Sequence, residues 1–263
     1  MNHEKYFRFG MEILDQTRAF ILQSIKEGFE KEKKLDDSFV TSADKGAERI
    51  LRTGIEESFP DHGIVGEEYG VVNESAEYVW YLDPIDGTAE FVNGLPQYGT
   101  LLSLYYRGDP VFGAIDHPSL DLRLHAVKNK GTFLNEKRVL ISDIENKSSI
   151  ENETIAIGPR FMFEKHGAEH VYDYIIANHK SIDEVQNCHW HTRLLQEEFG
   201  AVVDYGLRLW DISPVKILIE EAGGTFLKID EKIVDGKDRH AIVFGKSKVV
   251  DKMMGLINDA GIE

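Results

Sequence analysis

The chain has little of what several classes of protein require. It contains one cysteine, Cys188, among 263 residues, so an internal disulfide framework is excluded and the reducing cytoplasm is the expected compartment. No apolar run approaches the roughly 18 residues of a membrane-spanning helix, and the N-terminal residues show no charged-then-apolar leader. Basic residues are outnumbered: 30 Lys and Arg stand against 46 Asp and Glu, for a formal net charge of −16. Because nucleic acids and membrane surfaces select a basic face, we expect neither as a partner.

The composition is otherwise that of a folded globular protein. Apolar residues make up 42% and charged residues 29% of the chain, which are ordinary proportions. The length allows one large domain or two tightly joined lobes. The polar, unpatterned stretch 143–152 is the best boundary, and it predicts an N-terminal lobe at 1–145 and a C-terminal lobe at 146–263.

The N-terminal lobe has the pattern of an α+β unit. Apolar residues at helical spacing predict a helix over 4–29 and a second helix that begins near Thr41. Short apolar runs predict strands at 64–68 and 78–82 and an antiparallel set between 99 and 127, with the helices covering one face. The remaining segments are expected to be a solvated loop at 30–37, with an active-site flap as the alternative, and turns at 128–131 and 135–137.

The C-terminal lobe alternates between the two kinds of element, which predicts an α/β unit with parallel or mixed strands. Its expected strands are 154–158, 182–185, 202–205, 225–229 and 241–244, and its expected helices are 163–178, 191–199, 212–222 and 249–257.

Candidate chemistry is concentrated in the stretch from Asp83 to Thr88, which directly follows the apolar run 78–82. Two carboxylates three residues apart, Asp83 and Asp86, can converge on one point of a turn. Gly87 and Thr88 add backbone N–H groups and a hydroxyl, which suit an anionic phosphoryl group. Oxygen ligands of this kind are those that Mg²⁺ prefers. The spacing excludes an aspartyl-nucleophile D-x-D-G-T site and an EF-hand loop; a plain surface turn is the alternative.

Other carboxylates are ambiguous from local pattern alone. Asp44 lies in the first turn of the second helix, where an acidic residue commonly stabilises the helix. Glu67 and Glu68 end the strand at 64–68, and a pair of exposed glutamates is usually solvated surface. Because few residues separate Glu67 and Glu68 from Asp83, the acidic end of their strand can nevertheless lie beside the turn that begins at Asp83.

Several blocks of residues together resemble the inositol monophosphatase family of Mg²⁺-dependent, lithium-sensitive phosphatases. In chain order they are Val40 to Glu48, Gly66-Glu67-Glu68, Asp83 to Thr88 with Phe91, Gly94 and Pro96, and Trp210-Asp211 with Glu221 to Gly224. Framework residues 60–68 and 76–80 are most similar to the bacterial histidinol-phosphatase branch. The resemblance implies an α/β/α/β/α layered sandwich, a homodimer, and a small phosphorylated metabolite as the substrate.

The resemblance also implies roles for individual residues. Two or three Mg²⁺ ions would be held by Glu67, Asp83, the carbonyl of Ile85, Asp86 and Asp211. Catalysis would use Glu67 together with Thr88 and Asp44, which would orient the attacking water. The N–H groups of Gly87 and Thr88 would hold the phosphate. The chemistry of such a site is direct attack of metal-activated water on phosphorus, without a covalent phosphoenzyme.

The alcohol-binding region departs from the histidinol-phosphatase pattern. Members of that branch place an Asp before a Cys-aromatic pair, whereas Asn187 precedes Cys188 here, so a charge-assisted hydrogen bond would become an ordinary one. Asn187 and Asp204 are the candidate contacts to the alcohol. His189 and His191 are interpreted as packing or pocket residues rather than metal ligands.

The expected substrates are histidinol phosphate or an inositol monophosphate. Two alternatives within the enzyme class are a sugar bisphosphate and a 3′-phosphonucleotide. A second phosphate calls for basic residues in 155–195, where only Arg160, Lys165, Lys180 and Arg193 are available. A regulatory member that has lost turnover is the alternative from another class.

Overall fold

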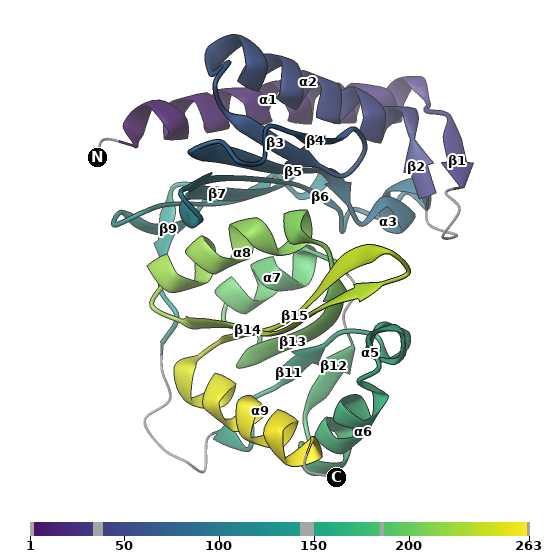
Figure 1. Cartoon of the computed structure of the whole chain (residues 1–263), viewed down its shortest axis with the longest axis vertical. Coiled ribbons are helices and arrows are strands. Elements are labelled where there is room, and N and C mark those ends of the chain that lie inside the picture. Colours follow the sequence, from purple (N-terminus) through teal and green to yellow (C-terminus); the bar gives the residue numbers. More distant parts are fainter. Residues whose placement is uncertain (1–2, 34–38, 143–149, 185–186, 262–263) are drawn as a thin grey trace.

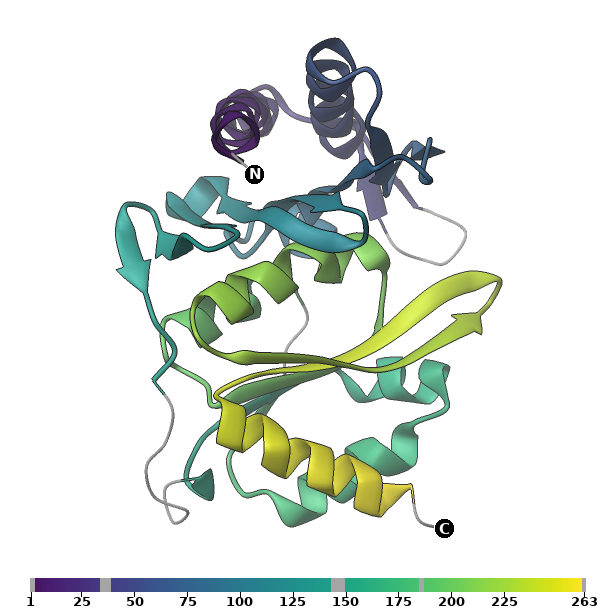
Figure 2. The same ribbon diagram turned by 60° about the vertical axis from the view of Figure 1, so that its left-hand side comes forward.

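The computed structural model describes residues 3–33, 39–142, 150–184 and 187–261. Helices and sheets alternate along its long axis in the order α/β/α/β/α (Figure 1), and the turned view shows the same stacking (Figure 2). The layered sandwich expected from the sequence is therefore confirmed. In the described part of the chain, no helix is long and apolar enough to span a membrane.

The first layer consists of α1 (Glu4–Glu27) and α2 (Ser42–Ser58). Both bury one apolar stripe, as amphipathic helices do, and Leu14 and Leu51 are fully buried. A capping box begins α2: the Thr41 side chain accepts from the N–H groups of Ala43 and Asp44, and the Asp44 carboxylate accepts from the Thr41 N–H. Such reciprocal bonds satisfy N–H groups that the first helical turn leaves open.

The helices α1 and α2 cover an eight-stranded sheet. Its strands, in spatial order, are β10 (Lys137–Val139), β9 (Gly131–Leu134), β8 (Leu122–Val127), β7 (Asp109–His117), β6 (Gly99–Tyr106), β5 (Tyr78–Asp86), β3 (Gly63–Gly66) and β4 (Gly70–Val72). Only β3 and β5 pair in parallel. The turns expected at 128–131 and 135–137 flank two strands, β9 and β10, which are too short to show a period of two in the sequence.

The next layer contains α7 (His189–Leu195) and α8 (Leu209–Glu221), which lie between the sheets. The buried residues of α8 include Ile212, Val215 and Leu218, which share one core cluster with Leu101 of the first sheet and Phe244 of the second. A helix without a polar face is one that is covered on both sides.

The second sheet has five strands. In spatial order they are β12 (Ile182–Glu184), β11 (Ile155–Ile157), β13 (Ala201–Leu207), β15 (Lys237–Gly245) and β14 (Thr225–Val234). The parallel pairs are β11 with β12 and with β13; the others are antiparallel, so the expected mixed sheet is present. The β14–β15 hairpin is longer than expected and turns at Asp235 and Gly236, both with positive φ. Its turn end projects past the sheet on the side of α5 (Figures 1 and 2).

The last layer comprises α5 (Arg160–His166), α6 (Glu169–Asn178) and α9 (Ser247–Ala260). One continuous helix was expected over 163–178, but Gly167 adopts a left-handed conformation, φ 68°, and ends α5. Glycine adopts that conformation without steric cost, which makes it the usual residue after a helix.

Four shorter elements complete the fold of the described residues. β1 (Lys31–Lys33) pairs with β2 (Phe39–Thr41), so part of the loop expected at 30–37 is a strand, while 34–38 lies outside the described residues. α3 (Thr88–Val92) and a 3₁₀ turn at Pro118–Leu120 are the others. The expected lobe boundary at 145/146 also lies outside the described residues.

Candidate metal centre and active site

The turn from Asp83 to Thr88 is held rigidly at the end of β5. The pairing of β5 with β6 is irregular between Asp83 and Asp86, which frees this stretch from the regular ladder. The Asp83 carboxylate accepts from the Ile85 N–H at 3.1 Å, and the Thr100 hydroxyl donates to the Pro84 carbonyl at 2.8 Å. Gly87 has φ 82°, and a Cβ there would lie 2.9 Å from the Gln97 carbonyl oxygen, so the turn requires glycine.

The third carboxylate comes from a distant part of the chain. Asp211 lies in the first turn of α8, where its side chain accepts from the Arg208 N–H at 2.7 Å. Asp83, Asp86 and Asp211 each offer an oxygen atom, and these atoms lie within 4.8 Å of one another. The structure thus brings together three of the residues that the sequence analysis selected as metal ligands.

Burial makes this cluster electrostatically unfavourable without a cation. Loss of hydration, followed by repulsion from neighbouring carboxylates, raises the pKa of Asp83 and Asp211 well above the ordinary value. Burial likewise raises the pKa of Asp86 to about 6, although the Cys188 N–H, 2.5 Å from its Oδ2, opposes the shift. A hard divalent cation with oxygen ligands fits these residues, because its charge removes the repulsion among them.

Asp44 and Thr88 lie side by side next to this cluster. The Thr88 hydroxyl is 3.4 Å from Asp44 Oδ1 and 3.0 Å from the Ile85 carbonyl oxygen. Burial raises the pKa of Asp44 to about 6, against the opposing hydrogen bonds from Thr41. Asp44 therefore combines the helix-stabilising role that its position suggests with a place beside the candidate catalytic hydroxyl.

A cavity of about 790 Å³ opens over these groups. It is lined by Glu67, Glu68, Asp83, Ile85, Asp86, Gly87, Thr88, Phe161, Met162, Lys165, Arg208, Trp210, Asp211, Lys237 and Arg239. Of the basic members, Lys165 of α5 was named from the sequence as a candidate for a second phosphate, whereas Arg208, Lys237 and Arg239 were missed. Arg208 caps α8 and the other two belong to β15, and no motif links them in the sequence.

The two arginines of this cavity are anchored by backbone carbonyl groups. Arg208 donates to the Asp238 carbonyl at 2.9 Å, and Arg239 donates to the Gly206 carbonyl at 2.8 Å. Burial and the neighbouring charge of Arg239 lower the pKa of Arg208 from its ordinary value. The two guanidinium groups therefore hold positive charge close together at the cavity.

The two residues expected to contact the alcohol do not line this cavity. Asn187 lies just before α7, and its side-chain oxygen accepts from the His189 N–H at 3.0 Å. Asp204 is buried in β13, where it accepts from the Tyr205 N–H at 2.8 Å, and burial raises its pKa to about 7. Cys188, next to Asn187, connects this segment directly with Asp86 through its N–H.

The histidines of the same region are held by packing. His191 is buried against the Phe244 ring, with ring centroids 5.2 Å apart, and burial lowers its pKa to about 4. His117 bonds to the Tyr98 carbonyl and the Thr192 hydroxyl. In the described part of the chain, the one cluster with metal-ligand spacing is the aspartate group.

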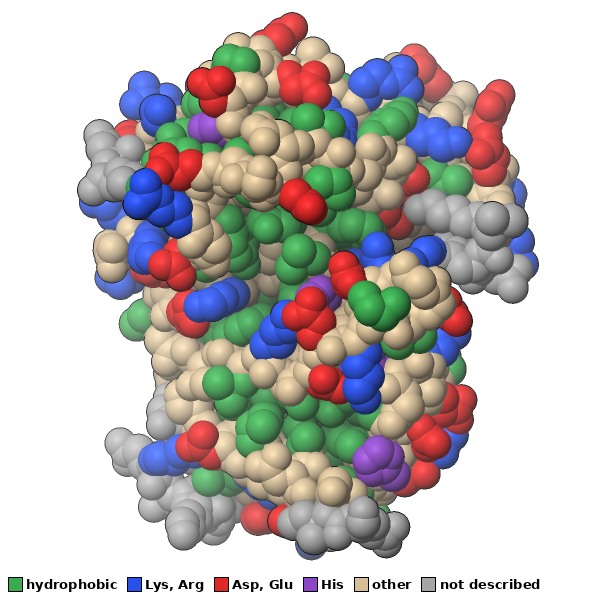
Figure 3. Space-filling view, viewed as in Figure 1, with side chains coloured by type: hydrophobic (Ala, Val, Ile, Leu, Met, Phe, Trp, Pro, Cys, Tyr) green, Lys and Arg blue, Asp and Glu red, His purple; other side chains and the backbone are tan. Residues whose placement is uncertain are grey.

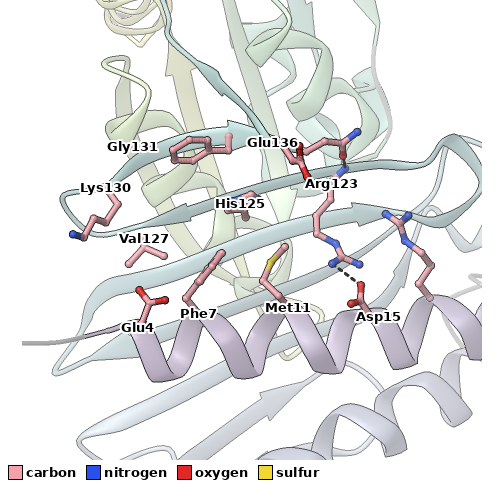
Figure 4. Close-up of a pocket in the computed structure, with 13 residues that line it drawn as sticks. Glu4, Phe7, Met11, Asp15, Arg123, His125, Val127, Lys130, Gly131 and Glu136 are labelled. Atoms are coloured by element: carbon pink, nitrogen blue, oxygen red, sulfur yellow. Dashed lines mark hydrogen bonds and ion pairs between the residues drawn. The ribbon is translucent and has the colours of Figure 1, made fainter.

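A second cavity, of about 640 Å³, lies between α1 and strands β8 and β9 (Figure 4). Phe7, Met11 and Val127 supply apolar surface, and Arg123 pairs with Asp15 at 2.8 Å along one side. Among the described residues, the carboxylates with metal-ligand spacing belong to the first cavity, not to this one.

Comparison with known proteins agrees with this geometry. The chain matches the inositol monophosphatase family over residues 3–258. It is 31% identical to a histidinol-phosphatase of Chlorobaculum parvum, with 78% of each chain covered. It is 28% identical to a fructose-1,6-bisphosphatase/inositol-1-monophosphatase of Aquifex aeolicus, covering 80% of this chain and 81% of the relative. A Nus factor SuhB of Pseudomonas aeruginosa is 25% identical, covering 71% and 70% respectively.

Solved structures share the fold. The inositol monophosphatase (IMPase) TM1415 of Thermotoga maritima superimposes with a TM-score of 0.80 over 97% of this chain and 98% of that chain, at 23% identity. At this identity the likeness establishes the layered fold.

Proposed function

Because the chain belongs to the inositol monophosphatase family, we propose that it is a Mg²⁺-dependent, lithium-sensitive phosphatase that hydrolyses a small phosphorylated alcohol. The observation that carries the proposal is the convergence of Asp83, Asp86 and Asp211, whose oxygens lie within 4.8 Å of one another. Glu67 and the Ile85 carbonyl group, which border the same cavity, are assigned to the same two or three Mg²⁺ ions.

The ions would lower the pKa of a water molecule and neutralise charge on the phosphoryl oxygens. The chain's own groups position the reactants. The Thr88 hydroxyl and the Asp44 carboxylate, 3.4 Å apart, orient the attacking water, with Glu67 beside them. The N–H groups of Gly87 and Thr88 precede the first hydrogen-bonded turn of α3, so they have no partner within the helix and are assigned to the phosphate.

The first substrates to test are histidinol phosphate and inositol monophosphate. A relative that carries the name histidinol-phosphatase supports the former. Asn187 is assigned to the alcohol because it adjoins Cys188, whose N–H binds Asp86, and Asp204 is assigned with it. The proposed setting is the cytoplasm, the proposed assembly is a homodimer, and neither nucleic acid nor membrane is proposed as a partner.

The test is phosphate release from both substrates in Mg²⁺, in EDTA, and in Mg²⁺ with added Li⁺. We expect turnover that EDTA abolishes and Li⁺ inhibits. Absence of turnover with every small phosphomonoester in Mg²⁺ would overturn the proposal and favour a regulatory role, a class to which the name of the SuhB relative points.

A sugar bisphosphate or a 3′-phosphonucleotide is the second candidate substrate class. The basic residues that line the cavity favour it. Lys165 lies in the region 155–195, where basic residues for a second phosphate were expected. The other basic residues of the cavity lie outside that region.

A further inference from the structure

One hydrogen bond connects a proposed metal ligand with the helix layer between the two sheets. Cys188, the residue that precedes α7, donates its N–H to Asp86 Oδ2 at 2.5 Å. A bond to one carboxylate oxygen restricts rotation of the side chain and leaves the other oxygen for a cation. Because partners of this kind orient metal ligands, the position of Cys188 affects the orientation of the Asp86 carboxylate.

His117, the last residue of β7, holds α7 on the side away from this bond. Its Nδ1 lies 2.8 Å from the Tyr98 carbonyl oxygen, and its Nε2 lies 2.7 Å from the hydroxyl of Thr192 in α7. A carbonyl oxygen can only accept, so Nδ1 carries the proton. Burial lowers the pKa of His117 to about 4. The ring is therefore neutral at pH 7, and Nε2 accepts the hydrogen bond that the Thr192 hydroxyl donates.

The contacts continue around the start of α7 to the metal turn. Thr192 donates its N–H to the Cys188 carbonyl oxygen at 3.3 Å, one helical turn back. Asp86 pairs with Gly99 across β5 and β6. A Cβ on Gly99 would lie 3.0 Å from both Cys188 Sγ and His117 Nδ1, so α7 and β7 can approach the metal turn this closely only beside a glycine.

These contacts lie in the interior, where the loss of one hydrogen bond matters most. Acidic and basic side chains are interspersed over the face of the molecule in Figure 3, and charges exposed in this way interact weakly through water. His117 and Thr192, by contrast, are wholly buried, and Cys188 is 1% exposed. Removal of one partner in such a place leaves a buried polar atom without a hydrogen bond, which the surrounding structure can relieve only by moving.

We propose that His117 is a positioning residue for the metal centre: through Thr192 and the Cys188 N–H, it fixes the Asp86 carboxylate in the orientation that binds the cation. The inference rests on the proposed function, because Asp86 is a metal ligand only in that assignment. In this role His117 contacts neither the cation nor the substrate. Its contribution is to metal affinity, and it affects turnover through the occupancy of the metal site.

The experiment measures binding of Mn²⁺, a hard cation suited to carboxylate ligands, from the loss of the free-ion signal in electron paramagnetic resonance. Thr192→Val keeps the shape of the side chain and removes the donor to His117, whereas Thr192→Ser retains the hydroxyl. We expect Thr192→Val to weaken the tightest Mn²⁺ binding by about tenfold, as is typical of groups that orient metal ligands. Thr192→Ser should recover most of that loss.

A second variant tests His117 itself. His117→Asn keeps an N–H donor for the Tyr98 carbonyl group but has no atom at the place of Nε2. We expect it to weaken Mn²⁺ binding as much as Thr192→Val does, because both remove the same bond to α7. Full Mn²⁺ affinity in His117→Asn would overturn the inference.

A matched control distinguishes a displaced ligand from a weakened fold. Thr17 is likewise wholly buried, but its hydroxyl donates to the Ile13 carbonyl within α1 at 2.8 Å. Thr17→Val should lower the midpoint of thermal unfolding and leave Mn²⁺ affinity unchanged. The same outcome for Thr192→Val, a lower midpoint with full affinity, would mean that its hydrogen bond is purely structural and would overturn the positioning role.

Binding and turnover together separate this inference from the proposed function. Phosphate release should require about tenfold more Mg²⁺ in Thr192→Val than in the wild type. Mn²⁺ binding that Thr192→Val weakens, without turnover of any small phosphomonoester, would uphold the positioning role and reject the phosphatase. Turnover in the wild type, with equal Mn²⁺ affinity in Thr192→Val, would reject the positioning role alone. A wild-type protein that neither binds Mn²⁺ nor turns over would overturn both.

Discussion

The acidic and basic residues that line the cavity, here called its acidic side and its basic side, come from different kinds of sequence. Two of the five acidic residues, Asp83 and Asp86, belong to one contiguous motif that a turn folds onto itself. The basic side is assembled from positions 165, 208, 237 and 239, which only the three-dimensional fold brings together. The difference teaches that residues of a contiguous motif can be recognised from the sequence, whereas residues that a hairpin brings to the same cavity cannot.

The largest expected effect concerns the acidic side. Asp86→Asn keeps an oxygen that can accept from the Cys188 N–H but removes a negative charge from the proposed Mg²⁺ site. We expect kcat to fall by at least about 10³-fold, since the ions supply most of the charge stabilisation in such a reaction. Phosphate release is the measurement, and circular dichroism controls for folding. Near-normal turnover would remove Asp86 from the site.

A smaller loss is expected from the hydroxyl that orients the water. Thr88→Val keeps the shape of the side chain but can bind neither Asp44 nor the Ile85 carbonyl group. We expect kcat to fall by about 10- to 100-fold, because positioning rather than charge is lost. Thr88→Ser, which retains the hydroxyl, is the matched control. The assignment of Thr88 fails if the valine and serine variants turn over alike.

The repulsion within the acidic side should appear in stability when metal is removed. The folded-state pKa of Asp86, about 6, lies above its ordinary value of 3.8, so its contribution to stability is fully present below pH 3.8 and is lost as the pH rises through about 6. In EDTA at pH 7, Asp86→Asn should therefore be more stable than the wild type by on the order of 1–3 kcal/mol. Urea unfolding at pH 7 and pH 4 tests this, and the gain should shrink at the lower pH. A gain of equal size at both values would contradict the electrostatic cause.

The smallest effect is expected at the exposed end of the basic side. Lys165 is exposed on α5, and exposed charges act weakly through water. Lys165→Gln should lower kcat/KM for a small phosphomonoester by no more than about threefold, well below the loss in Thr88→Val. A loss in Lys165→Gln as large as that in Thr88→Val would place Lys165 in direct contact with the substrate.

The layered fold is confirmed, but it was expected from the resemblance to the family, whereas local patterns predicted individual helices and strands. The apolar run before Asp83 and the glycine at 87 predicted the turn, while its contacts with Gln97 and Thr100 depend on the fold. The metal site at this turn stays a prediction. Asp211 required the resemblance to the family, since no local pattern connects it to that turn. Asn187 and Asp204 were selected on the same resemblance, and their proposed role in binding the alcohol stays a prediction.

The long hairpin could not be predicted from periodicity. Beyond Lys228 the outer part of β14 carries Asp230, Glu231 and Lys232 in succession, and its side chains are partly or fully exposed. A strand exposed on both faces has no alternation of apolar and polar residues, so it resembles a loop in the sequence. The position of Arg239 at the cavity depends on that hairpin and was missed with it.

The location of α8 between the two sheets also has a consequence for synthesis of the chain. Leu101 and Ile115 of the first sheet share a core cluster with Val215 and Leu218 of α8. On the ribosome the first sheet is complete by Val139, some seventy residues before α8 begins at Leu209. Until α7 and then α8 emerge, the apolar underside of the first sheet lacks the helices that cover it in the folded protein, and a chaperone or the ribosome surface is the available substitute.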